Sequence, residues 1–93
     1  MTTWFYILRL RSGSLYAGAT EDVERRYREH QSGEACRTTK IDPPEALLYR
    51  EEFSDFSAAR KREAQVKRWT RDKKMALIAG DTALLKQLSK RRK

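Results

Sequence analysis

The sequence predicts a single α+β domain with the element order β-β-α-(α)-β-α-α-α. Near the start, two runs rich in aromatic and β-branched residues flank a Gly/Ser turn, the pattern of a β-hairpin. Later apolar residues recur mostly at helical spacing, between residues that favour helix caps. The chain has 93 residues, which is enough for one domain and no more.

The predicted hairpin spans residues 4–18. Its first strand, residues 3–10, is apolar at consecutive positions, so we expect its middle to be buried on both faces. In the following turn, RSGS, Gly13 can adopt a positive φ at low cost. LYAG then predicts a short second strand, in which Gly18 lets the backbone approach another element or a ligand closely.

The first helix is predicted over residues 21–32. Thr20 is the expected N-cap, because its hydroxyl can accept a hydrogen bond from a free backbone N–H. Acidic residues follow in the first turn, where the helix dipole favours negative charge. Gly33 is expected to end the helix, since glycine adopts the left-handed conformation easily.

Two stripes of this helix predict different environments. Val23 and Tyr27 are four residues apart and are expected to face the core. Arg26 and His30 have the same spacing, one position round the helix. We therefore expect Arg26 and His30 at the border between core and solvent, on the side that could face the hairpin.

The middle of the chain is harder to assign. Residues 34–45 are predicted to be irregular or to contain one short helix, which Pro43 and Pro44 would stop. Residues 46–53 favour a third strand. The next helix is expected to begin at a Ser54 or Ser57 cap and to run to about residue 69 or beyond. Its inward side would carry Phe56, Ala59, Glu63, Val66 and then Trp69 or Thr70.

Two short helices complete the prediction. Residues 72–80 form the first and end at Gly80, and residues 81–93 form the second, with Asp81 as its cap and a frayed basic end. Leu84, Leu85 and Leu88 give this last helix an apolar face. We expect residues 1–80 to form the domain proper, with 81–93 packed on it or extending it.

Charge is distributed unevenly and favours a polyanionic partner. The net charge is +8, yet residues 1–59 carry eight Lys/Arg against ten Asp/Glu, whereas residues 60–93 carry thirteen against three. This asymmetry favours nucleic acid first and an anionic membrane second, with a solvated basic tail as the plain alternative. One cysteine, Cys36, allows no internal disulfide and offers no metal cluster. No apolar run approaches a membrane span and the N-terminus lacks a signal pattern, so we expect a cytoplasmic protein.

A set of side chains suits the cutting of a phosphodiester bond, which needs an activated water, a cation for the transition state and fixed geometry. The set is Tyr6, Tyr16, Arg26, His30 and Glu63. Taken singly, each has an ordinary alternative: tyrosines fill cores, helix arginines are solvated, and Glu63 can pair with Lys67 four residues on.

In combination, these residues resemble the GIY-YIG nuclease family. The paired motif is present as Phe5-Tyr6-Ile7 and Tyr16-Ala17-Gly18. RRYREH matches the family's helix, with its arginine at Arg26 and its histidine at His30, and AARKREAQVKRW resembles the later helix that carries a metal-binding glutamate, here Glu63. The resemblance covers about residues 3–80 and looks closest to small stand-alone bacterial members.

The resemblance implies a small three-stranded antiparallel sheet flanked by helices, and an endonuclease that hydrolyses DNA with one Mg²⁺ or Mn²⁺. Tyr16 would be the general base or would orient the attacking water, while Tyr6 would hold that water or the phosphate. Arg26 would stabilise negative charge, His30 would hydrogen-bond a motif tyrosine and help move its proton, and Glu63 would bind the metal ion. Because a tyrosine pKa of about 10 makes a poor base at neutral pH, Tyr16 would need nearby cations to act as one.

The sequence also departs from the family pattern. Phe5 replaces the usual glycine of the first motif and Ala17 the usual isoleucine of the second, and neither change removes a tyrosine. The chain contains no asparagine, although many family nucleases use one near the phosphate; Lys67 or Lys73 could substitute for it. A non-catalytic nucleic-acid-binding module on the same fold is therefore the main alternative, and a protein- or membrane-surface role for the last helix is a third.

For either function the expected partner is DNA, with RNA left open, and we expect a monomer or weak dimer. The predicted contacts are basic side chains on and around the two helices: Arg25, Lys67, Arg68, Arg71, Lys73 and Lys74. A domain of this size has little room for sequence readout, so recognition is expected to depend on DNA backbone and shape.

Overall fold

A computed structural model describes residues 2–90 of the chain. Three antiparallel strands form one sheet in the order β2-β1-β3: β1 (Thr3–Leu10), β2 (Leu15–Thr20) and β3 (Pro44–Phe53). β1 is the central strand, which explains why its middle is buried on both faces as predicted. The predicted three-stranded antiparallel sheet is therefore confirmed.

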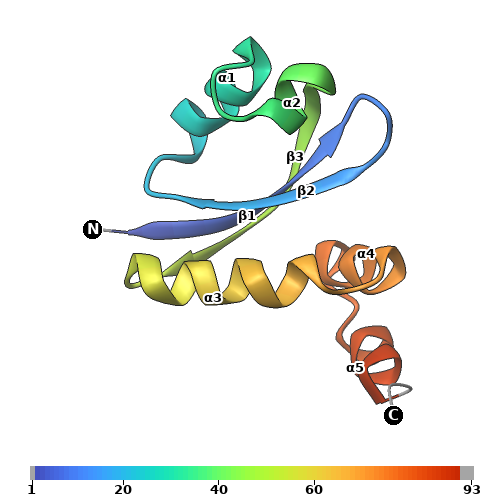
Figure 1. Cartoon of the computed structure of the whole chain (residues 1–93). Coiled ribbons are helices and arrows are strands. Elements are labelled where there is room, and N and C mark those ends of the chain that lie inside the picture. The colour runs from blue at the N-terminus through green and yellow to red at the C-terminus, as the bar shows by residue number, and fades with distance from the viewer. Residues whose placement is uncertain (1, 91–93) are drawn as a thin grey trace.

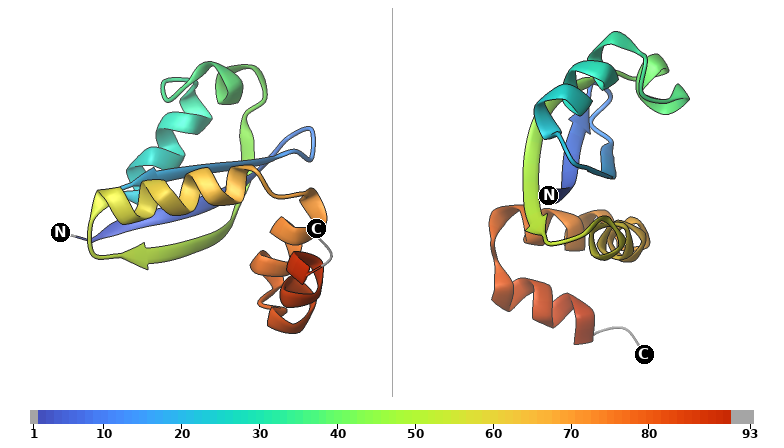
Figure 2. Two further views of the ribbon diagram at one scale, coloured as in Figure 1. Left: turned by 60° about the horizontal axis from the view of Figure 1, so that its bottom comes forward. Right: turned by 90° about the vertical axis from the view of Figure 1, so that its left-hand side faces the viewer.

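Helices cover both faces of the sheet, so the predicted α+β class is also confirmed (Figure 1). α1 (Val23–Ser32) and α2 (Arg37–Ile41) lie on one face, and α3 (Phe56–Lys67) runs along the other. α4 (Arg71–Ala79) follows at the end of α3, and α5 (Thr82–Lys90) lies beyond α4, away from the sheet (Figure 2). Within residues 2–90, no helix combines the length and apolar content that a bilayer span requires.

Alternation along β1 divides the core into two layers. Phe5 and Ile7 point to the α3 side, where they pack with Val66 and Leu77. Tyr6, Leu8 and Leu10 form the other layer, against which Tyr16 and Tyr27 pack. Since Leu8 is the cross-strand partner of Tyr16, and Tyr6 that of Gly18, both motif tyrosines lie on the α1 side of the sheet.

The start of α1 corrects the predicted cap. Asp22, and not Thr20, is the N-cap, because its carboxylate accepts a hydrogen bond of 3.1 Å from the backbone N–H of Arg25. Thr20 still belongs to β2 and is buried. Its hydroxyl instead accepts a hydrogen bond of 3.1 Å from the backbone N–H of Asp22, so it shapes the turn before the helix. The predicted end of the helix at Gly33 is confirmed by its positive φ of 85°.

The bounds of α3 also differ from the prediction. Neither Ser54 nor Ser57 caps it, since the Asp55 carboxylate accepts a hydrogen bond of 2.8 Å from the backbone N–H of Ala58. The helix ends at Lys67, two residues short of the predicted bound, because Thr70 already caps α4. Residues 37–41 form the short helix that the sequence left open, and β3 begins at Pro44, which an edge strand tolerates.

The last two helices follow the predicted capping pattern. Gly80 ends α4 with a positive φ of 72°, and the Asp81 carboxylate accepts a hydrogen bond of 3.0 Å from the backbone N–H of Leu84. Leu85 packs against the core layer of the α3 side, whereas Leu84 is 39% exposed. The predicted division at residue 80 stays a prediction, and residues 91–93 of the predicted basic end lie outside the described range.

Gly18 provides the space through which the Tyr6 side chain crosses β2. A Cβ atom at Gly18 would lie 2.5 Å from Cζ of Tyr6, which is far closer than packed atoms approach. Gly18 has no positive φ, so its lack of a side chain, and not its backbone freedom, is what the fold uses.

We predict that Gly18→Ala destabilises the protein by about 1–3 kcal/mol, the usual cost of overpacking a core. The change in the free energy of urea unfolding measures this cost. In a Tyr6→Leu background the same substitution should cost clearly less, because the ring that it meets is gone. An equal cost in both backgrounds would contradict this account of Gly18.

Candidate active site

The five predicted site residues meet at the β2 edge of the sheet. Tyr6 and Tyr16 reach this edge from β1 and β2, Arg26 and His30 from α1, and Glu63 from α3 on the opposite side. The Tyr6 hydroxyl lies 2.9 Å from Nε2 of His30, and the Tyr16 ring centroid lies 5.1 Å from that of His30. The charges of Arg26 and Glu63 both act on Tyr6. The tertiary structure therefore brings together residues that are up to 57 positions apart (Tyr6 to Glu63).

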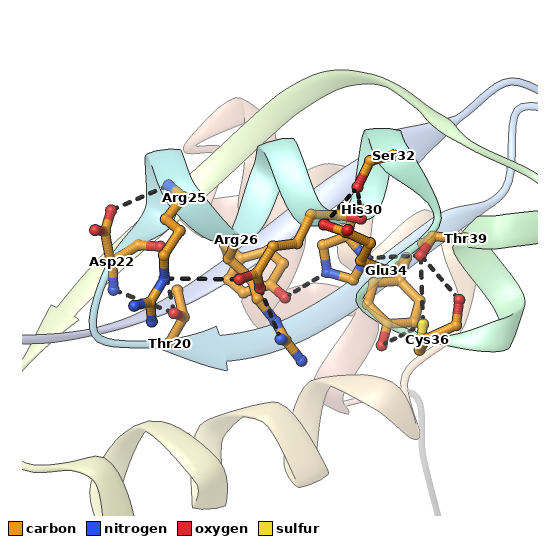
Figure 3. Close-up of polar contacts among 12 residues, drawn as sticks. Thr20, Asp22, Arg25, Arg26, His30, Ser32, Glu34, Cys36 and Thr39 are labelled. Carbon is orange, nitrogen blue, oxygen red and sulfur yellow. Dashed lines mark hydrogen bonds and ion pairs between the residues drawn. The ribbon is translucent and has the colours of Figure 1, made fainter.

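A hydrogen-bonded chain links the two tyrosines through the interior (Figure 3). From Tyr6 it passes to Nε2 of His30, and from Nδ1 of His30 to the Thr39 hydroxyl at 2.8 Å. The Thr39 hydroxyl lies 3.4 Å from Sγ of Cys36, and this thiol donates to the Tyr16 hydroxyl at 3.4 Å. α2 and the residue that precedes it thus supply the second half of the chain.

His30 is fully buried, which corrects the prediction that it lies at the border between core and solvent. The correction has a local cause, because α2 packs over this end of α1 and places Thr39 against the ring. Burial, and then the nearby positive charge of Arg26, lower the pKa of His30 from 6.5 to about 4. At neutral pH the imidazole is therefore uncharged, with one protonated and one free nitrogen.

Arg26 is at the predicted border. Its guanidinium is held by Glu29, with Nη1 3.1 Å from Oε1, and its side chain remains 38% exposed. Burial alone would lower the pKa of Arg26, but Glu29 and Tyr6 raise it, so the group stays positively charged. A guanidinium that is fixed on one side and open on the other can bind a phosphate group.

A shallow hollow lies beside Arg26 and gives it access from solvent. It is lined by Ala19, Thr20, Glu21, Arg25, Arg26 and Phe56. Phe56 was expected on the inward side of α3, but it is the first residue of that helix and its side chain is 42% exposed. The hollow thus places an exposed aromatic ring next to two arginines.

The two tyrosines are neutral hydroxyls in this structure. Burial raises the pKa of Tyr6 above its ordinary value, although the adjacent Arg26 opposes the change. Burial also raises the pKa of Tyr16, and the hydrogen bond with Cys36 adds to this effect. The expected lowering of the Tyr16 pKa is thus absent from this arrangement, so at neutral pH the phenolate that would act as a base is scarcer here than in a free tyrosine.

Glu63 is paired with two cations. Lys67 Nζ lies 2.9 Å from one carboxylate oxygen and Arg60 Nε lies 3.5 Å from the other, and the Glu63 side chain is 15% exposed. The i,i+4 pair with Lys67 that the sequence allowed is therefore present. Lys67 also stands over the Tyr16 ring, 5.9 Å from its centroid, which places its ammonium group between Glu63 and Tyr16.

The site offers one carboxylate, Glu63, as a metal ligand, which is enough for a single hard cation such as Mg²⁺ or Mn²⁺. Among residues 2–90, no three His, Cys, Asp or Glu side chains form a metal-binding group. A single carboxylate such as Glu63 can still hold Mg²⁺ or Mn²⁺, since these ions keep several waters and accept phosphate oxygens from a substrate. The residues fit such an ion on the condition that the Lys67 ammonium moves away from the carboxylate oxygen that it now occupies.

The other predicted DNA contacts differ in their placement. Arg25 lines the hollow beside Arg26 and is 60% exposed, although it also lies near Glu29. Arg68 is exposed at the end of α3. The three predicted contacts on α4 are less available to DNA, because each is engaged or partly covered within the protein. Arg71 donates a hydrogen bond of 2.8 Å to the carbonyl of Gly13, the Lys73 ammonium lies 4.3 Å from the Trp69 ring centroid, and Lys74 is half-buried.

Sequence reasoning missed two members of the site, Thr39 and Cys36. The sequence indicated only that Cys36 forms no internal disulfide and no metal cluster, and it did not single out Thr39. Neither carries a local signal, because their significance comes from contacts with His30 and Tyr16, nine and twenty residues away. Only the packing of α2 against α1 could reveal them.

The lowered pKa of His30 predicts a pH-dependent contribution to stability. The unfolded chain binds a proton at His30 near pH 6.5, whereas the folded chain resists protonation down to about pH 4. Stability from neutral His30 is thus complete above pH 6.5 and is lost as the pH falls towards 4. Relative to His30→Gln, the free energy of unfolding of the wild type should fall by about 3 kcal/mol between pH 7.5 and 4. Parallel pH profiles in urea unfolding would contradict the assignment.

Comparison with known proteins agrees with this geometry. Residues 2–76 match the family model described as the GIY-YIG catalytic domain. The chain is 41% identical over 76 residues to a UPF0213 protein of Staphylococcus saprophyticus, an alignment that covers 82% of this chain and 93% of the relative. It is 41% identical over 73 residues to a UPF0213 protein of Staphylococcus aureus strain N315, covering 78% and 89%.

A solved structure is similar as well. The solution NMR structure of a UPF0213 protein from Bacillus halodurans has 35% sequence identity and a TM-score of 0.54, with coverage of 85% of this chain and 84% of that chain. The family model spans most of the sequence, and the site geometry contains each residue that the resemblance implied. The chain therefore belongs to the GIY-YIG nuclease family, among the small bacterial UPF0213 proteins.

Proposed function

We propose that this protein is a divalent-metal-dependent endonuclease that hydrolyses phosphodiester bonds in DNA, with branched or single-stranded DNA of the kind that repair produces as its substrate. The observation that carries the proposal is the convergence of Tyr6, Tyr16, Arg26, His30 and Glu63 at one sheet edge in a member of a nuclease family. Hydrolysis adds one water across the bond: the hydroxyl goes to phosphorus, and a proton goes to the leaving 3′ oxygen.

Arg26 would bind the scissile phosphate, and Tyr6 would hold the attacking water beside it. The open side of the Arg26 guanidinium faces the hollow, where it would donate hydrogen bonds to phosphate oxygens and stabilise the charge that grows in the transition state. Tyr6 is buried and is fixed by His30, so its hydroxyl keeps one position beside Arg26. A preorganised pair of this kind needs little reorganisation during the reaction.

Of the two roles open to Tyr16, the structure favours orientation of the attacking water. Its raised pKa keeps the hydroxyl protonated at neutral pH, which disfavours proton abstraction. The neutral hydroxyl accepts from the Cys36 thiol, so its position is fixed from the interior. It can then hold a water molecule on its outer side, in line for attack on phosphorus.

Glu63 would hold the divalent ion. When bound, such an ion would neutralise charge on the phosphate and assist departure of the 3′ oxygen. The displaced Lys67 ammonium is close enough to Tyr16 to contact a phosphate of the substrate, which would provide a cation in a chain that has no asparagine. Arg25, Arg68 and exposed Phe56 would bind the flanking backbone and an unpaired base.

A non-catalytic nucleic-acid-binding module remains the second candidate function, on the strength of one observation. Lys67 neutralises the carboxylate that a metal ion would need, at a distance of 2.9 Å. If this ion pair persists in the presence of metal ions and DNA, the site would bind phosphate without cutting it. Binding would then depend on salt, since phosphate contacts release counterions.

We predict that the wild type nicks supercoiled plasmid and cuts a branched oligonucleotide duplex with Mg²⁺ or Mn²⁺. Glu63→Gln and Arg26→Ala should lower the rate at least about 100-fold, because each removes charge that acts in the transition state. Tyr16→Phe should lose activity for want of the water-orienting hydroxyl. Glu52→Gln is the matched control, since this exposed carboxylate lies on β3.

The outcomes separate the two candidate functions. Equal activity in the wild type and all variants would indicate a contaminant and would remove the assignment. Salt-dependent binding by a wild type that cuts with neither metal would favour the binding module.

We also predict that Lys67→Met binds Mn²⁺ more tightly than the wild type, by about two- to fivefold, because the ion no longer has to displace a surface ion pair. Isothermal titration calorimetry without DNA measures this dissociation constant directly. Lys61→Met is the matched control on the same helix, since Lys61 is exposed and makes no ion pair among the described residues. Unchanged or weaker Mn²⁺ binding in Lys67→Met would argue against Glu63 as the metal ligand.

A further inference from the structure

Thr39 lies at the centre of the buried hydrogen-bonded chain between the two tyrosines, yet none of the catalytic roles proposed above uses it. It is fully buried in α2, a helix of only five residues. Its hydroxyl has three neighbours: Nδ1 of His30 at 2.8 Å, Sγ of Cys36 at 3.4 Å and the backbone carbonyl of Cys36 at 3.5 Å. A threonine hydroxyl has one proton to donate, so these contacts restrict how the protons of the chain can be arranged.

The carbonyl of Cys36 fixes the direction at Thr39. A carbonyl oxygen can only accept, so the Thr39 hydroxyl donates its proton to it, a common arrangement in the first turn of a helix. The shorter contact, from Thr39 to His30, must then be one in which the threonine oxygen accepts. The proton of the neutral imidazole therefore lies on Nδ1, and Nε2 carries the free electron pair.

The same tautomer fixes the direction of the hydrogen bond between His30 and Tyr6. Nε2 without a proton can only accept, so the Tyr6 hydroxyl donates its proton to His30 across 2.9 Å. Arg26, which lies beside Tyr6, has only donors. With its proton turned to His30, the Tyr6 oxygen presents its lone pairs to Arg26. In the other tautomer, His30 and Arg26 would both donate to Tyr6, and the tyrosine proton would have neither as acceptor.

We infer that Thr39 is a positioning residue, which fixes His30 as the Nδ1–H tautomer and thereby keeps the Tyr6 lone pairs directed at Arg26 and at the attacking water. The inference deepens the proposed function, on which the identity of the substrate rests. Cys36 links Thr39 to Tyr16, because its backbone carbonyl accepts from the Thr39 hydroxyl and its thiol donates to the Tyr16 hydroxyl. One short helix thus orients the hydroxyls of both motif tyrosines from behind.

The chain offers a direct test, because His30 is its only histidine. With ¹⁵N-labelled histidine, two-bond ¹H–¹⁵N NMR at pH 7 reports which ring nitrogen carries the proton. We expect a pyrrole-type shift for Nδ1 and a pyridine-type shift for Nε2 in the wild type. Thr39→Val should shift the spectrum towards the Nε2–H tautomer, Thr39→Ser should restore the wild-type spectrum, and Thr38→Val should leave it unchanged. Thr38 is the matched control, an exposed threonine on the same helix.

The wild-type spectrum alone can overturn the inference, so it does not depend on the folding of a variant. A wild-type Nε2–H tautomer, or a Thr39→Val spectrum like that of the wild type, would overturn it. The rate of DNA cleavage supplies a separate readout. Thr39→Val should cut DNA about tenfold more slowly than the wild type and Thr39→Ser at nearly the wild-type rate, as expected for a residue that acts through His30 and does not touch the substrate.

A wild-type rate in a Thr39→Val protein with altered tautomer would overturn the positioning role. If the wild type shows the Nδ1–H tautomer but cuts no DNA, the proposed nuclease function fails while the assignment of Thr39 to the tautomer stands.

Discussion

The buried hydrogen bond between Tyr6 and His30 is the interaction on which the rest of the site depends. It ties the central strand to α1 across the edge strand, and it is possible only because Gly18 leaves room for the tyrosine ring. A buried imidazole with an unpaired nitrogen would cost roughly 1–3 kcal/mol. The second nitrogen therefore needs a partner, and Thr39 of α2 is that partner. Consistent with this requirement, no buried side-chain nitrogen or oxygen in the described part of the chain lacks a hydrogen bond.

The two faces of the sheet divide structural and chemical roles between them. The α3 side of β1 is an ordinary apolar layer built on Phe5 and Ile7. The α1 side carries the polar-tipped rings that form the candidate site, so the same side chains fill the core and would supply the proposed chemistry. A small domain has few residues to spare for either task, which explains why substitution of Tyr6 or His30 would affect both stability and function.

Electrostatics sets the resting state of the site. Burial holds His30 uncharged and both tyrosines protonated, while Arg26 stays cationic beside them. On the α3 side, Lys67 neutralises Glu63, and in the proposed function a divalent ion would take the place of its ammonium group. The basic residues in the last third of the sequence add a positive field, which would attract a polyanion such as nucleic acid.

The sequence by itself determined the hairpin, the burial of β1 on both faces, the ends of α1 and α4 at Gly33 and Gly80, and the i,i+4 pair of Glu63 with Lys67 in α3. These features depend on neighbours a few residues apart, so local patterns predict them. The caps of α1 and α3 were wrong because serine, threonine and aspartate compete for that role at adjacent positions. Only the tertiary structure decided that His30 is buried, that Phe56 is exposed, and that Thr39 and Cys36 join the site. Each of these depends on which distant element covers the residue, and in particular on the packing of α2 over α1, which no local pattern encodes.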